Sequence, residues 1–144
     1  MKTVIASIHA DYVQYIFDGS KKYEIRKNAP DKAPFEVLIY ETKKRRPIEH
    51  VILQGRGMIV GKFTVEKVEE FTTDYRADKK QTERIQKGSC LAMVDLVEYE
   101  KSGKSSCLYA WHISDVRVFK YPRKITDFVD RPPQSYCYVR RSYK

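Results

Sequence analysis

Charged side chains gather in the segment "SKKYEIRK", residues 20–27, where they could bind an anionic ligand. Lys21 and Lys22 could contact phosphate groups, and Arg26 could bind a phosphate bidentately or stack on a nucleobase. Glu24 could accept a hydrogen bond from a base amino group or orient Arg26. The alternative is a ladder of surface ion pairs between Glu24 and its neighbours, each of which contributes only about 0–1 kcal/mol.

A second polar segment, "RPPQSY" at residues 131–136, could present side chains from a rigid turn. Pro132 and Pro133 restrict the backbone, which would fix the direction of the residues that follow. Gln134 could pair bidentately with a base edge, and Ser135 could hydrogen-bond a phosphate or a base. The alternative, which the residues allow equally well, is a turn whose side chains cap its own backbone.

The single tryptophan, Trp111, has two possible roles. It could stack on a base, a contact that contributes about 1–3 kcal/mol, or it could belong to the core with its indole N–H bonded to a neighbour. Alternation places Trp111 on the same strand face as Ile113, which favours the core. Cys107 and His112 are too isolated to form a zinc site, so we predict no metal and no cofactor.

The composition, with 42% apolar and 33% charged residues, is typical of a soluble globular protein. The length suits one domain, residues 1–144, and no apolar run approaches the ~20 residues of a membrane span. The N-terminus does not resemble a signal peptide. The three cysteines form no CxxC pair, which indicates reduced thiols and predicts a cytoplasmic location.

The net charge of +9 is unevenly distributed along the chain. Residues 61–106 carry nine positive and nine negative charges, whereas residues 1–60 have a net charge of +4 and residues 107–144 a net charge of +5. If the two ends of the chain meet in the fold, they form one basic surface that suits a polyanion such as nucleic acid. The alternative is that the positive charge serves solubility alone.

The elements that must position these residues are mostly short strands. Alternation and β-branched residues predict strands at residues 3–8, 22–26, 35–42, 57–71, 107–113, 116–121 and 135–139. Helical spacing predicts a helix over residues 9–18. It also favours a helix over 89–103, with Ser89 as its N-cap and with Cys90, Met93, Val94 and Val97 on its apolar face; a hairpin arm is the alternative for this segment. The basic segment 43–50 and the polar segment 73–88, the latter with room for one exposed helical turn, are predicted to be loops. Because helices do not separate successive strands, this order predicts an α+β fold, a small, mainly antiparallel β-barrel covered by two or more helices.

Five segments of the chain together resemble the ASCH domain, which is named for homology to activating signal cointegrator. They are "GSKKYEIRK", "VLIYET", "IVGKFTVEKV", "YAWHISDVRVFKYPRKITDF" and "RPPQSYCYV". The resemblance runs in order from Thr3 to Val139, and it is greatest to the short single-domain ASCH proteins of bacteria and their phages. ASCH domains belong to the PUA-like superfamily, so the resemblance implies a twisted β-barrel with a cleft beside the first helix.

The resemblance also implies a class of ligand. PUA-like domains commonly bind RNA, and ASCH domains have been proposed to act in RNA-linked regulation. We therefore expect an RNA- or nucleotide-binding module with a basic cleft between residues 20–27 and residues 131–136. The resemblance places two more residues near that cleft, Ser7 and His9. The expected nucleic-acid-binding residues are thus Ser7, His9, Lys21, Lys22, Glu24, Arg26, Lys27, Arg131, Gln134, Ser135 and Tyr136.

Some members of the family are reported to be enzymes, either ribonucleases or amidohydrolases that act on acetylated cytidine. The resemblance implies that the amidohydrolases have a lysine at the position of Lys21 and a threonine nucleophile at the position of Glu24. A carboxylate cannot simply replace a hydroxyl that must form an ester, so we predict no catalytic residues of that kind. The alternatives to a binding module are a hydrolase of RNA or modified nucleosides that uses Lys21 and Glu24, and a protein-interaction adaptor in transcription regulation.

Overall fold

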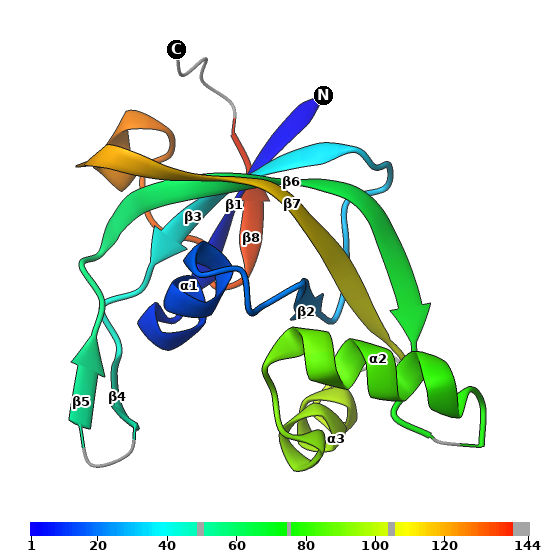
Figure 1. Ribbon diagram of the computed structural model, residues 1–144. Coiled ribbons are helices and arrows are strands. Elements are labelled where there is room, and N and C mark those ends of the chain that lie inside the picture. Colours follow the sequence, from blue (N-terminus) through cyan, green and yellow to red (C-terminus); the bar gives the residue numbers. More distant parts are fainter. Residues whose placement is uncertain (49–50, 75, 104–105, 140–144) are drawn as a thin grey trace.

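The computed structural model describes the chain except residues 49–50, 75, 104–105 and 140–144. Figure 1 labels its strands and helices. In chain order they are β1 (Lys2–Ile8), α1 (Ala10–Phe17), β2 (Tyr23–Arg26), β3 (Phe35–Glu41), β4 (Arg45–Ile48), β5 (Val51–Gln54), β6 (Met58–Phe71), α2 (Lys79–Ser89), α3 (Met93–Lys101), β7 (Leu108–Arg123), the 3-10 helix η1 (Ile125–Asp127) and β8 (Tyr136–Tyr138).

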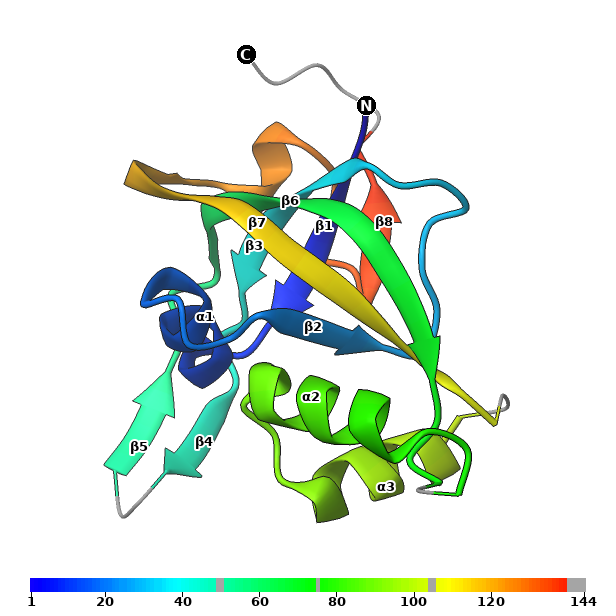
Figure 2. The ribbon, with the colours of Figure 1, turned by 45° about the vertical axis from the view of Figure 1, so that its right-hand side comes forward.

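Six of the strands form one mixed sheet in the order β2-β7-β6-β3-β1-β8. The pair β1–β3 is parallel and the other neighbouring strands are antiparallel. The sheet curls into a half-barrel whose edge strands are β2 and β8 (Figures 1 and 2). The strands predicted at residues 3–8, 22–26 and 135–139 therefore share one sheet, and the predicted α+β class is confirmed.

Apolar side chains from alternate strand positions fill the side of the sheet that α1 covers. Val4 and Phe35 are fully buried there, and Ile16 of α1 packs on the same cluster. Trp111 is 0% exposed, and its Nε1–H donates to the backbone oxygen of Asn28 at 3.3 Å. The tryptophan therefore belongs to the core and does not present a stacking surface.

The prediction of a loop over residues 73–88 is wrong, because most of this segment belongs to α2. Asp78 is the N-cap of the helix, and its side chain accepts a hydrogen bond from the backbone N–H of Gln81 at 3.1 Å. Ile85 is the one buried aliphatic residue that α2 contributes to the core. A single apolar position in three turns gives too weak a periodic signal to predict a helix.

The second predicted helix is confirmed as α3, but it is shorter than residues 89–103 and buries a different face from the one predicted. Ser89 ends α2 instead of capping α3, and Cys90 separates the two helices in a left-handed conformation with φ of 62°. The buried face centres on Leu96, whereas Val94, predicted to be on that face, is 62% exposed. Among the described residues, no helix is long and apolar enough to cross a membrane.

Two further predictions about the strands differ from the structure. The basic segment 43–50 is not a loop throughout, because Arg45–Ile48 form β4, which pairs with β5 in a separate hairpin; the last two residues of the segment lie outside the described chain. The two strands predicted at residues 107–113 and 116–121 are one strand, β7. The strand continues through Asp115, whose φ is 46°. Irregularities in the β6–β7 pairing accommodate this left-handed residue within the strand.

Candidate functional site

A pocket of about 430 Å³ lies between α1, β2 and α3. This volume falls within the ~300–1,000 Å³ of typical small-ligand sites. Its walls come from the end of β1, α1, the segment around β2, α3 with the residues before it, and the turn before β8. The lining residues are Ser7, Ile8, His9, Tyr12, Lys21, Glu24, Ile25, Arg26, Leu91, Asp95, Tyr99 and Gln134. The two polar segments singled out in the sequence thus contribute to one pocket.

The charged residues around β2 are buried, so they do not form a ladder of surface ion pairs. Lys21, Glu24 and Arg26 are 2%, 6% and 7% exposed. Glu24 lies opposite Trp111 in the antiparallel β2–β7 register, which directs both side chains to the same side of the sheet. Ile25 alternates with these charges and packs with residues of α2 and α3, and it also lines the pocket. Both faces of β2 are therefore covered, and the charged face lines the pocket.

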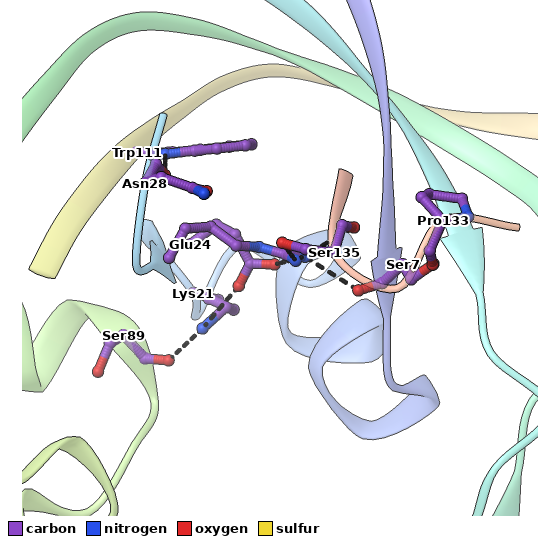
Figure 3. Close-up of polar contacts among 9 residues, drawn as sticks. Ser7, Lys21, Glu24, Asn28, Ser89, Trp111, Pro133 and Ser135 are labelled. Atoms are coloured by element: carbon purple, nitrogen blue, oxygen red, sulfur yellow. Dashed lines mark hydrogen bonds and ion pairs between the residues drawn. The ribbon is translucent and has the colours of Figure 1, made fainter. Parts of the chain in front are cut away.

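Lys21 reaches from the loop before β2 toward the end of α2 (Figure 3). Its Nζ donates to the backbone oxygen of Ser89 at 2.6 Å and lies 3.7 Å from Glu24 Oε1. The ammonium also lies 5.0 Å from the centre of the Tyr12 ring. Burial lowers the pKa of Lys21, and the neighbouring Glu24 carboxylate opposes part of that shift. The pocket wall thus places a hydrogen-bond donor beside an acceptor.

Arg26 connects the two edges of the half-barrel. Its NH1 group donates to the backbone oxygen of Ser135 at 3.3 Å and to Ser135 Oγ at 3.2 Å. Its NH2 group donates to the backbone oxygen of Ser7 at 2.9 Å and to Glu24 Oε2 at 3.2 Å. The guanidinium therefore joins β2 to the residue before β8. Arg26 thus has a role in joining these segments, and because it also lines the pocket, the ligand contact expected from the sequence stays a prediction.

The turn "RPPQSY" is held by the end of β1. Ser7 Oγ donates to the backbone oxygen of Pro133 at 2.6 Å, and the Ser7 N–H donates to the backbone oxygen of Ser135 at 3.0 Å (Figure 3). Gln134, between these two anchored residues, is exposed and lines the pocket. The turn thus presents the Gln134 side chain at the pocket rim, while Ser7 and Ser135 position it.

The formal charges that line the pocket cancel. Lys21 and Arg26 contribute two positive charges, and Glu24 and Asp95 contribute two negative charges. Tyr12 of α1, a residue of the predicted first helix, adds aromatic surface to the wall. The pocket is therefore polar but balanced in charge, which suits a neutral ligand group with donors and acceptors better than a phosphate.

Of the remaining predicted residues, His9 lines the pocket and the other four, Lys22, Lys27, Arg131 and Tyr136, do not. Lys22 and Arg131 are exposed and are not among the lining residues. Lys27 is half-buried, with its ammonium 4.6 Å from the ring centre of Tyr99, a lining residue. Tyr136 packs edge-on against the core tryptophan. His9 does line the pocket, and its Nδ1 lies 3.2 Å from Thr42 Oγ1.

Several lining residues were missed by the sequence reasoning, chiefly Asp95 and Tyr99 of α3. They are four residues apart, so they lie on the same face of the helix. The predicted helix over residues 89–103 contained both, but its apolar face was centred on the wrong residues. Leu96, the buried residue of α3, is next to Asp95 and three residues before Tyr99, so knowledge of the buried face was needed to place these two side chains beside the pocket.

A second polar cluster lies on β6 and β7 and contributes no residue to the pocket wall. Glu69 Oε2 accepts hydrogen bonds from Arg84 NH2 at 2.6 Å and from Gln81 Nε2 at 3.0 Å, and Oε1 lies 2.7 Å from His112 Nε2. Burial would raise the pKa of Glu69, but these hydrogen bonds outweigh it and lower the pKa to about 2. The cluster fastens α2 to the sheet. Within the part of the chain that the structure describes, no group of His, Cys, Asp and Glu could hold a metal ion.

Comparisons with known proteins agree with this architecture. Residues 7–123 match the family model of the ASCH domain, and no curated protein matches the chain. A crystal structure of ASCH from Zymomonas mobilis has a TM-score of 0.71 and 19% sequence identity, with 96% of this chain and 88% of that chain covered. A tyrosine-to-phenylalanine mutant of ZmASCH from the same organism has a TM-score of 0.71 and 18% identity, with coverages of 97% and 91%. These structures share the fold, and the family model covers most of the sequence. The chain therefore belongs to the ASCH domain family.

Proposed function

We propose that the protein binds single-stranded RNA by holding one nucleoside unit in the pocket between α1, β2 and α3. The observation that carries this proposal is the buried pair of Lys21 and Glu24, whose charged groups stand 3.7 Å apart on the pocket wall. A donor beside an acceptor complements the edge of a nucleobase, which presents amino donors next to ring or carbonyl acceptors. Family membership adds a class of fold that suits RNA.

The balance of charge in the pocket supports a nucleoside rather than a phosphate as the enclosed group. Tyr12 and Tyr99 line the pocket from two different helices and supply aromatic surface for a base. Stacking of a base on an aromatic side chain contributes about 1–3 kcal/mol. A base enclosed among these side chains cannot remain paired in a duplex, so the ligand is a single strand or a flipped-out nucleotide.

Gln134 offers the sharpest test of this site, because it is an exposed rim residue whose replacement leaves the core intact. We expect Gln134→Ala to weaken the binding of a preferred single-stranded RNA by about 1–3 kcal/mol. Gln14→Ala, at an exposed position of α1 outside the pocket lining, is the matched control and should bind as the native chain does. Fluorescence anisotropy with labelled RNA measures both.

The same titrations should include an RNA duplex of identical sequence. We expect the duplex to bind more weakly than the single strand, because its bases must unpair before one can enter the pocket. Equal affinity of Gln134→Ala and Gln14→Ala, or tighter binding of the duplex, would reject this pocket as the RNA site. Failure of the native chain to bind any single-stranded RNA would reject the function itself.

Hydrolysis of RNA or of a modified nucleoside is the second candidate, and the burial of Lys21 favours it. A lysine whose pKa is lowered by burial is less strongly protonated, and a carboxylate at 3.7 Å could act as a general base. Ester formation by a residue at position 24, as in the family's amidohydrolases, is not available to Glu24. We therefore expect no release of cytidine from N-acetylcytidine by the purified protein.

Glu24→Gln separates the two candidates. In a binding module the variant should keep RNA affinity, because an amide still offers an oxygen acceptor and a negative charge is removed. In a hydrolase the variant should bind its substrate and lose turnover. Clear turnover by the native chain that disappears in Glu24→Gln would establish the enzyme and displace the binding module as the primary function.

A further inference from the structure

A run of four cationic residues, Lys43 to Arg46, begins beside the pocket. It leads from the end of β3 into β4, the first strand of the two-stranded hairpin. Figures 1 and 2 show this hairpin extending from the half-barrel on the side of α1, while α2 and α3 lie on the other side of β2. Both Lys43 and Lys44 are exposed. The hairpin therefore carries positive charge away from a pocket whose own charges cancel.

The start of this basic run is fixed to the pocket wall. The N–H of Thr42 donates to the backbone oxygen of Ile8 at 3.0 Å, and Thr42 Oγ1 lies 3.2 Å from His9 Nδ1. Both Ile8 and His9 line the pocket. Lys43 is the next residue along the chain after Thr42, so its backbone lies within one residue of the pocket rim.

The segment that follows β5, residues 55–57, is held equally firmly. Together with residues 42–44 it forms the base of the hairpin, the hairpin neck. The N–H of Gly57 donates to the backbone oxygen of Glu41 at 2.9 Å, and the N–H of Arg56 donates to Glu41 Oε1 at 2.8 Å. Gly57 has φ of +69°, and a Cβ atom there would lie 2.6 Å from Lys43 Cγ. The aliphatic part of Lys43 thus packs on a glycine that leaves room for it. Packing of the stem with an exposed ammonium fixes the direction in which the charge points.

We propose that Lys43 and Lys44 hold the phosphates of the RNA strand that leaves the pocket. This inference rests on the proposed function, because it assigns the path of the strand whose nucleoside occupies the pocket. The pocket supplies no net positive charge for phosphates, whereas the hairpin neck supplies consecutive positive charges directly beside the rim. Binding thus divides between a neutral pocket that encloses a base and a basic neck that holds the backbone.

Salt dependence distinguishes phosphate contacts from contacts in the pocket. Each neutralised phosphate of a single strand contributes about −0.7 to the slope of log K against log salt concentration. We expect the double variant Lys43→Ala/Lys44→Ala to reduce the magnitude of the slope for a short single-stranded oligonucleotide by about 1.4, two such contacts. The same variant should bind a mononucleoside as the native chain does, because a nucleoside has no phosphate.

The matched control is Lys79→Ala/Lys80→Ala, which removes two adjacent exposed lysines at the start of α2 and the same net charge. Affinities are measured by anisotropy for the oligonucleotide and by calorimetry for the nucleoside, from ~50 to ~200 mM salt. The control should keep the native slope. If both ligands bind and the two double variants have the same slope, the neck is not the phosphate site, although the pocket stands. If neither ligand binds the native chain, the proposed function fails as well.

Discussion

Removal of the Arg26 side chain should open the gap between the two edge strands of the half-barrel. Four hydrogen bonds from this guanidinium reach Ser7, Glu24 and Ser135, and they cross from β2 to the segment that precedes β8. Breaking a buried ion pair by deleting one partner costs about 3–5 kcal/mol, because the other charge remains buried. We therefore expect Arg26→Ala to lower the free energy of unfolding by about 3–5 kcal/mol.

A lysine at the same position separates charge from geometry. Arg26→Lys keeps a positive charge near Glu24, but a single ammonium cannot reproduce the planar fork that bonds Glu24 and Ser135 together. We expect its loss of unfolding free energy to be about 1–3 kcal/mol, the range for hydrogen bonds that involve a charged group, and so smaller than the loss in Arg26→Ala. Urea denaturation measures both variants, and an unchanged slope against urea would indicate that the native states remain equally compact.

The fluorescence of Trp111 reports whether the gap between the two edge strands stays closed. It is the only tryptophan, it is fully buried, and the Arg26 guanidinium lies 5.8 Å from its ring centre. If Arg26→Ala opens the gap, water reaches the indole and the emission of the folded variant shifts to longer wavelength. A variant with unchanged emission and an unfolding free energy within ~0.5 kcal/mol of the native value would refute the closure argument.

Two other perturbations test the surrounding structure. The pKa of Glu69 is lowered to about 2 from its ordinary value of 4.5, so its contribution to stability is present above pH 4.5 and is lost as the pH falls toward 2. Glu69→Gln should therefore be less stable at neutral pH and lose less stability over that acid range; parallel acid-unfolding curves for the two chains would contradict this. Gly61→Ala should be destabilised by about 1–3 kcal/mol, because a Cβ there would lie 2.5 Å from the backbone oxygen of Arg117 and 2.8 Å from the Phe17 ring. Thermal unfolding measures this cost, and a melting temperature equal to that of the native chain would show that the β6–β7 pairing can give way.

The strands could be predicted from the sequence because their signals are local. Residues 3–8 and 35–42 are rich in β-branched and apolar residues, and both proved to be central strands with consecutive buried residues. Helix α2 could not be predicted in the same way, because Ile85 alone supplies its apolar contact with the core. Its other support comes from polar contacts, such as the Arg84–Glu69 ion pair, that join segments distant in sequence.

Only part of the candidate site could be predicted, for a related reason. The alternation of Glu24 and Arg26 with apolar residues indicated that both charges share a face, but not that the face is buried. Burial depends on α1 and α3 covering β2, which no local pattern encodes. Arg26 joins two segments of the fold, whereas Gln134 faces the pocket. This difference likewise depends on a contact distant in sequence, the hydrogen bond from Arg26 to Ser135, which lies 109 residues away.

The three buried charges beside β2 are not the arrangement that stability alone would favour. Apolar residues of similar volume often replace a buried ion pair without loss, and sometimes with a gain in stability. Arg26 has a structural role that an apolar side chain could not fill, because from the edge strand β2 it bonds the backbone oxygens of Ser7, in β1, and of Ser135, just before β8. Lys21 and Glu24 join no strands of their own, although Lys21 bonds the last backbone oxygen of α2 and Glu24 accepts a hydrogen bond from Arg26. Their place on the pocket wall, with a donor beside an acceptor, agrees with the proposed binding of a nucleoside there.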